Sequence, residues 1–243
     1  MPEQVSRGDG GDSQAARPAG ARVVFLDGPA DSVPAGAELR DIAQRWPVTA
    51  TAEIARARIV NIRSDTVQMP DGSEAAREVV EHPGAVAVLA LDDADRVLLI
   101  RQYRHPVAAL LWEIPAGLRD VPGEPAQVTA ERELLEETGY RAADWRVLAD
   151  FFTSPGFSTE RLRIFLARRL TAVPAAERQY VPEHEEAQLA LAWVPLDTAV
   201  RAFLAGDMHN GVAAVGILSA YVARQDARGG FEALRPAHAP ELP

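Results

Sequence analysis

The sequence contains no cysteine and no lysine among its 243 residues. Without cysteine, the chain has no disulfide framework, thiolate zinc site, iron–sulfur cluster or thiol nucleophile. Without lysine, it lacks both the phosphate-binding lysine of a P-loop and the Schiff-base lysine of pyridoxal enzymes. These absences exclude several common enzyme classes. They also leave arginine as the only permanently cationic side chain that could bind an anionic substrate.

Excess positive charge and long apolar runs are also missing. The 25 basic residues face 35 acidic ones, so the net charge of −10 opposes nucleic acid as a partner. The longest clean apolar runs, such as Ala85–Leu91, are far shorter than the roughly 18 residues that read as a membrane span. The first 22 residues show no apolar segment typical of a secretory signal. We therefore expect a soluble cytoplasmic protein that binds neither nucleic acid nor membrane.

The order of periodic segments predicts one main domain with two appendages. Residues 1–45 read as a flexible tail and an N-terminal extension of unknown role, and residues 227–243 as a loose C-terminal tail. Between them, residues 46–226 alternate strand patterns with a few helical ones; the helices are expected over 125–138, 196–204 and 211–224. This order predicts an α+β fold, an α/β/α sandwich in which helices cover a mixed sheet.

Three glutamates share one face of the first expected helix. At 100° per residue, Glu137 lies about 40° to one side of Glu133 and Glu136 about 60° to the other, whereas Val128 and Leu135 point away and are expected to be buried. Crowded carboxylates and hard oxygen ligands favour Mg²⁺ or Mn²⁺. The spacing fits equally well a solvated acidic face in which an arginine bridges neighbouring carboxylates.

The surrounding residues distinguish these two interpretations. The stretch resembles the Nudix hydrolase signature G-x5-E-x7-R-E-U-x-E-E-x-G-U, with residues 132–134, 136, 137 and 139 in register. Seven residues separate Glu124 from Arg132, as the pattern requires. There are two departures: six residues rather than five lie between Gly117 and Glu124, and the last apolar position is Tyr140. The additional residue lies in the loop before the helix, so it affects the loop rather than the carboxylate face.

Shorter matches extend the resemblance over about residues 48–206. The segments Gln102–Arg104, Leu111–Gly117 and Ser154–Phe157, with Glu160, look like the ADP-ribose pyrophosphatase branch. The resemblance implies a Nudix-like mixed sheet flanked by helices, a homodimer, and strands near the N-terminus that take part in dimerisation. It also implies metal-dependent hydrolysis of ADP-ribose to AMP and ribose 5-phosphate. There are two alternatives: the substrate is another nucleoside diphosphate sugar, or the protein is a sensing module that binds a nucleotide without cleaving it.

The same resemblance assigns the metal site. Glu133, Glu136, Glu137 and the backbone carbonyl of Ala116 are expected to hold Mg²⁺ or Mn²⁺. Arg132 is expected to join the helix and the loop through carboxylates. For Glu124 two roles stay open: a contribution through its side chain or a metal-bound water, or a role as the helix N-cap only.

The general base is expected on a loop beyond the signature. Glu183 and Glu185 are the candidates, with Glu183 ranked first by its distance from the signature, although a solvated acidic loop explains the same residues. For the substrate phosphates, Arg104 is the first candidate and Arg101 the second, because a guanidinium binds phosphate in bidentate fashion. Glu113 is expected to accept hydrogen bonds from the adenine or ribose, and Tyr103 to lie at the pocket edge.

Overall fold

The computed structural model describes residues 41–178 and 189–241, and the structural unit that carries the sheets begins at Trp46. The strands are β1 (Val48–Arg56), β2 (Asn61–Gln68), β3 (Glu74–Glu81), β4 (Ala85–Ala90), β5 (Arg96–Arg104), β6 (Ala109–Glu113), β7 (Ala116–Leu118), β8 (Tyr140–Phe152), β9 (Arg161–Ala172), β10 (Ala190–Pro195) and β11 (Arg235–Pro236). The helices are α1 (Ala126–Thr138), α2 (Leu196–Leu204) and α3 (Gly211–Arg224), with short 3₁₀ helices at His105–Val107, Ala175–Glu177 and Gly230–Ala233. The predicted extension over residues 1–45 lies outside the described residues except for 41–45.

A five-stranded sheet in the order β11-β8-β9-β4-β7 forms the centre of the unit. Strands β4 and β9 are parallel, and the other neighbouring pairs are antiparallel. Every residue of β4 is buried, which explains why its sequence is a continuous apolar run rather than an alternating one. The sheet is therefore mixed and covered on both faces.

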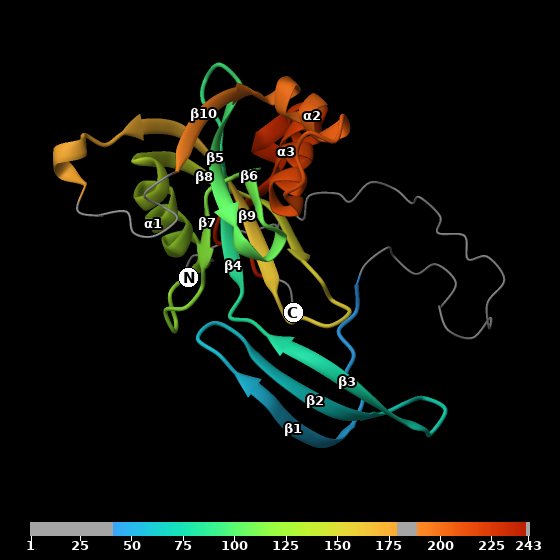
Figure 1. The fold of residues 1–243 in the computed structure, drawn as a ribbon. Helices are drawn as coiled ribbons and strands as arrows, with labels where there is room; N and C mark the ends of the chain where they lie inside the picture. The colour runs from blue at the N-terminus through green and yellow to red at the C-terminus, as the bar shows by residue number, and fades with distance from the viewer. Residues whose placement is uncertain (1–40, 179–188, 242–243) are drawn as a thin grey trace, which may run out of the picture. The chain divides into compact units, whose positions relative to one another are not determined.

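Alternate residues of β4 enter two separate hydrophobic clusters. Val86 and Val88 pack with Leu134 of α1, whereas Ala87 and Leu89 pack with Ile217 of α3 and with residues of α2. In Figure 1 the sheet runs between α1 on one side and α2 and α3 on the other. The arrangement confirms the expected α/β/α sandwich.

Two smaller sheets complete the described structure. One has the order β10-β5-β6, and the other is the antiparallel meander β1-β2-β3, in which every residue of β1 is exposed. Pro70, Asp71 and Gly72 lie between β2 and β3, where a turn needs residues of these types. The sequence did not reveal β6 and β7, because these strands are short and their residues alternate only weakly.

The C-terminal segment differs from the expected loose tail over residues 227–243. Strand β11 pairs with β8, and a buried arginine of β9, Arg163, donates hydrogen bonds to the carbonyl oxygens of Ala239 and Pro240 at 2.8 Å. The same guanidinium forms two hydrogen bonds with Asp150, at 2.7 and 2.9 Å. A buried cation requires such acceptors, and the proline-rich segment supplies carbonyl oxygens that no regular strand has already used.

Two ion pairs also hold the C-terminal segment against the sheet. Arg235 donates to Asp150, and Glu241 pairs with Arg119, which follows directly after β7. Burial would raise the pKa of Asp150, but hydrogen bonds from Arg163 and Arg235 outweigh it and lower the pKa below its ordinary value. The described tail is therefore part of the folded unit. Among the described helices, none is both long enough and apolar enough to cross a bilayer.

Candidate active site

Helix α1 carries the signature carboxylates on a face next to the sheet. Its buried positions include Ala126, Ala130 and Leu134, spaced four residues apart, whereas Val128 is 45% exposed. The prediction that the Val128 side is buried was therefore wrong. The small Ala126 and Ala130 allow a close approach to the sheet, and the three buried positions lie between about 20° and 60° from Glu137 around the helix axis. The carboxylates flank the interface with the sheet instead of pointing directly away from it.

Strand β7 contacts two of these carboxylates. The backbone N–H of Ala116 donates to Oε2 of Glu137 at 3.0 Å. A Cβ atom placed on Gly117 would lie 2.0 Å from the carboxyl carbon of Glu133, so only glycine leaves room for this side chain. Gly139, which ends α1 with a φ of +74°, is required for a different reason: its N–H caps the carbonyl of Leu135 in a left-handed conformation. Both signature glycines are thus explained by geometry.

Arg132 binds three signature carboxylates at once. Its guanidinium lies 2.7 Å from Glu133, 3.4 Å from Glu136 and 3.6 Å from Glu124. Burial alone would lower the pKa of Arg132, but attraction to these three carboxylates raises it above its ordinary value. Arg132 therefore offsets the repulsion among the carboxylates and joins the helix to the loop before it.

The two open roles of Glu124 can now be compared. The N-cap of α1 is Pro125 and makes no side-chain capping bond, so Glu124 is not the N-cap. Its Oε2 instead accepts a hydrogen bond from the Thr129 hydroxyl at 2.7 Å, beside the guanidinium of Arg132.

The donor set of the carboxylate face fits a hard divalent cation. Glu133, Glu136 and Glu137 offer only oxygen atoms, and they come from little more than one turn of helix. Within residues 41–178 and 189–241, no three acidic or histidine side chains already converge at the distances of a metal site. Arg132 compensates part of the negative charge there, and a divalent cation would compensate the rest.

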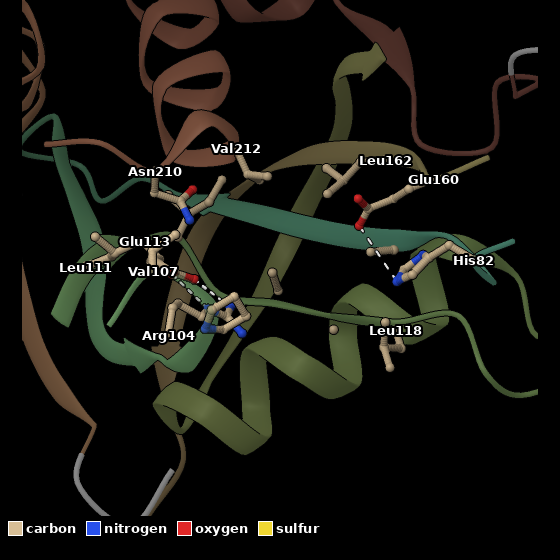
Figure 2. A pocket seen from close by; sticks show the side chains of 15 residues that line it. His82, Arg104, Val107, Leu111, Glu113, Leu118, Glu160, Leu162, Asn210 and Val212 are labelled. Carbon is tan, nitrogen blue, oxygen red and sulfur yellow. Dashed lines mark hydrogen bonds and ion pairs between the residues drawn. The ribbon is translucent and has the colours of Figure 1, made fainter. Parts of the chain in front are cut away.

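A cavity of about 430 Å³ opens beside β7 (Figure 2). This volume is within the range of small-molecule sites. Ala116 and Gly117, which contact the helix carboxylates, line it together with Arg104 and Glu113. Glu113 is almost fully buried and accepts two hydrogen bonds from Arg104, from Nε at 2.9 Å and from an Nη atom at 2.6 Å. This bidentate pair fixes the guanidinium of Arg104, whose side chain is 44% exposed, at the cavity wall.

The other predicted substrate residues lie elsewhere. Arg101 and Tyr103 alternate with Arg104 along β5, so their side chains point to the opposite face of the strand, and neither lines this cavity. Arg101 stacks over the ring of Trp112, its partner on β6, at 5.3 Å. The structure thus brings Arg104 and Glu113 together and does not add Arg101 or Tyr103 to them. Glu183 and Glu185 lie outside the described residues.

Sequence reasoning missed several residues of the cavity. His82, from the segment between β3 and β4, lines it beside Glu160, and Asn210 at the start of α3 completes another part of the wall. Figure 2 shows His82 and Glu160 on the side away from Arg104. Glu160 lies in a segment that resembles the family, but nothing in the local sequence pattern marks His82. Its place at the cavity follows from the pairing of β4 with β9.

Comparisons with known proteins agree with this geometry. The model of the NUDIX domain matches residues 81–214. The chain is 46% identical over 163 residues to an ADP-ribose pyrophosphatase of Mycobacterium tuberculosis, covering 67% of this chain and 77% of that protein. It is 39% identical over 136 residues to an ADP-ribose pyrophosphatase of Bacillus subtilis, covering 56% and 72%. A crystal structure of an ADP compounds hydrolase has the same fold, with a TM-score of 0.65 at 22% identity, over 76% of this chain and 97% of that one. The chain therefore belongs to the Nudix hydrolase family.

Proposed function

We propose that this protein hydrolyses the pyrophosphate bond of ADP-ribose, with AMP and ribose 5-phosphate as products. The observation that supports this most directly is the composition of one cavity. Its wall combines β7, which contacts the signature carboxylates, with an arginine held by a buried glutamate. The identity to two ADP-ribose pyrophosphatases gives the substrate class.

Arg104 is the proposed phosphate-binding cation. Glu113 accepts from Nε and one Nη, which fixes the plane of the guanidinium before substrate arrives. A fixed guanidinium loses little side-chain entropy on binding an anion. Glu113 is thus proposed as a positioning residue for Arg104, in place of the contact with the adenine or ribose expected from the sequence.

Nudix hydrolases generally need divalent metal ions, and we propose Mg²⁺ or Mn²⁺ here. Glu133, Glu136 and Glu137, with the carbonyl of Ala116, are the proposed ligands. A bound metal would withdraw charge from the phosphates and acidify a water molecule. Arg132 keeps the carboxylates from repelling one another until then, and the N–H of Ala116 orients Glu137.

The proposed base is a carboxylate of the segment around residues 183–185. One water oxygen forms a bond to phosphorus, the bond from phosphorus to the bridging oxygen breaks, and the water proton passes to the base. Glu183→Gln and Glu185→Gln should differ in turnover, with the larger loss at the base. Near-normal rates in both variants would place the base elsewhere in the chain.

A product analysis tests the reaction itself. The protein is incubated with ADP-ribose and other nucleoside diphosphate sugars, with and without Mg²⁺ or Mn²⁺, in ¹⁸O-labelled water. We expect AMP and ribose 5-phosphate by mass spectrometry, with the label in only one of them, as hydrolysis at a single phosphorus requires. Faster turnover of another nucleotide sugar would favour the alternative substrate. Tight nucleotide binding without any product would favour the sensing module.

Glu137→Gln distinguishes catalysis at this site from activity elsewhere. The variant keeps an oxygen for the Ala116 N–H but loses a negative charge from the proposed metal site. We expect turnover to fall by orders of magnitude with an unchanged circular dichroism spectrum. Wild-type turnover in Glu137→Gln would remove the metal assignment.

We further propose that the protein is a cytoplasmic homodimer. Support for the dimer comes from β1, in which every residue is exposed, and from the large apolar side chains of Trp46 and Ile54, which are 45% and 56% exposed. Light scattering should give twice the chain mass, and a fully active monomer would contradict the proposal. Cell fractionation tests the location.

A further inference from the structure

Strand β7, which contacts the signature carboxylates, is a weakly packed part of the central sheet. It has only three residues, it lies at the edge of the sheet beside β4, and each of its residues is half-buried. Gly117 in its middle has no side chain to pack, and the space beside it is taken by Glu133. Packing of β7 itself can therefore contribute little to holding Ala116 and Gly117 against the carboxylates.

Arg119, which directly follows β7, fixes the end of this strand. Its backbone N–H donates to the carbonyl of Gly84, just before β4, at 3.1 Å. Its side chain is 20% exposed, and an Nη atom donates to Oε2 of Glu241. The Nε atom is buried and has no hydrogen-bond partner in the described part of the chain. Without its carboxylate, this enclosed guanidinium would have to turn toward water, so the position of Arg119 depends on Glu241.

The C-terminal segment in turn holds Glu241 in place. Arg163 of β9, whose side chain is 5% exposed, donates to the carbonyl oxygens of the two residues directly before Glu241. Ala239 also packs against the hydrophobic cluster that contains Leu134 of α1. Glu241 is thus anchored to the centre of the sheet, and its ion pair with Arg119 extends this anchor to β7.

We propose that Glu241 is a positioning residue for the metal site, which acts through Arg119 and β7. This inference rests on the proposed function, since it concerns the metal ligands of that reaction. The carbonyl of Ala116 and the contacts of β7 with Glu133 and Glu137 keep their geometry only while the end of β7 stays in place. Neither Arg119 nor Glu241 lines the cavity of Figure 2, so breaking their ion pair affects the metal site more than substrate binding.

Glu241→Ala tests the proposal, because it removes the carboxylate that Arg119 binds. Glu232→Ala is the matched control: Glu232 also lies in the C-terminal part of the chain and also pairs with arginines of the sheet, but these arginines lie on β8 and β9. Arg119→Gln and the double variant Arg119→Gln/Glu241→Ala complete a double-mutant cycle. If Glu241 acts through Arg119, the two losses are not additive.

Hydrogen exchange of the metal-free protein measures the hold on β7 directly. The amide of Arg119 donates to Gly84, so its exchange reports whether the end of β7 opens. We expect this amide to exchange about tenfold faster in Glu241→Ala and to change by less than about twofold in Glu232→Ala. A lower unfolding midpoint with unchanged exchange at Arg119 would make Glu241 a merely structural residue and overturn the proposal.

Metal binding and kinetics measure the consequence for the site. Binding of Mn²⁺ in calorimetry should weaken about tenfold in Glu241→Ala. At saturating Mn²⁺, kcat for ADP-ribose should fall about tenfold while KM changes by less than about twofold, and the double variant should lose no more than Arg119→Gln alone. A loss confined to KM, additive losses, or an equal loss in Glu232→Ala would overturn the proposal. If the wild-type protein hydrolyses no nucleotide sugar, the proposed function fails, and the exchange comparison still decides this inference.

Discussion

Gly117→Ala tests whether the position of Glu133 matters more for activity than for stability. The added Cβ would lie 2.0 Å from the carboxyl carbon of Glu133, and ordinary contact between carbon atoms begins near 3.5 Å. The carboxylate must therefore move by roughly 1.5 Å. The clash involves the end of a flexible side chain, and Gly117 has no positive φ, so the backbone accepts alanine. We expect the free energy of unfolding to change by less than about 1 kcal/mol.

The effect on catalysis should be much larger. A displacement of about 1 Å in a catalytic group can cost on the order of 100-fold in rate. Turnover of Gly117→Ala should fall by about that factor, with weaker binding of Mn²⁺ in a calorimetric titration. Gly211→Ala is the control, because a Cβ there meets nothing within 4 Å. Turnover within threefold of wild type in Gly117→Ala, with a native melting curve, would refute the assignment of Glu133 to the metal site.

Three further predictions concern stability and substrate binding. Asp150→Asn leaves the buried Arg163 without its carboxylate and should cost about 3–5 kcal/mol at pH 7 in urea unfolding. The pKa of Asp150 is lowered in the folded protein, so its carboxylate contributes fully to the free energy of unfolding above about pH 4. This contribution is lost as the pH falls through the pKa of the folded state. The difference in stability between Asp150→Asn and wild type should therefore shrink in acid. Glu113→Gln should lower kcat/KM for ADP-ribose about tenfold, mainly through KM, by weakening its hold on Arg104; an unchanged KM would contradict this role. Gly139→Ala should destabilise the fold by roughly 1–2 kcal/mol, because a side chain at φ +74° is strained, and an unchanged unfolding midpoint would contradict that reason.

Much of the fold follows from local patterns in the sequence. The apolar run of β4 predicts a strand buried on both faces, and the helices over 196–204 and 211–224 begin and end where expected. The signature locates α1 and its carboxylates. These features depend on periodicity and capping, which neighbouring residues determine.

Other features depend on contacts between residues far apart in the chain. Nothing near Val128 indicates that the Ala126–Ala130 side of α1 packs on the sheet, since valine is the more apolar residue and the local sequence therefore favours its burial. Arg163 lies in an apolar strand, and its burial depends on carbonyl groups more than 70 residues later. His82 reaches the cavity only because of how the strands pair. Such long-range pairings carry no periodic signal in a single sequence.

The ordered tail has a practical consequence for anyone who shortens this chain. The family match ends at residue 214, inside α3, yet Ile217 and Ala220 belong to the core and the segment after Leu234 supplies acceptors for Arg163. A fragment trimmed to the match would expose an apolar groove and leave a guanidinium without hydrogen-bond acceptors. Expression clones that stop there should yield insoluble material, so useful end points lie beyond Glu241.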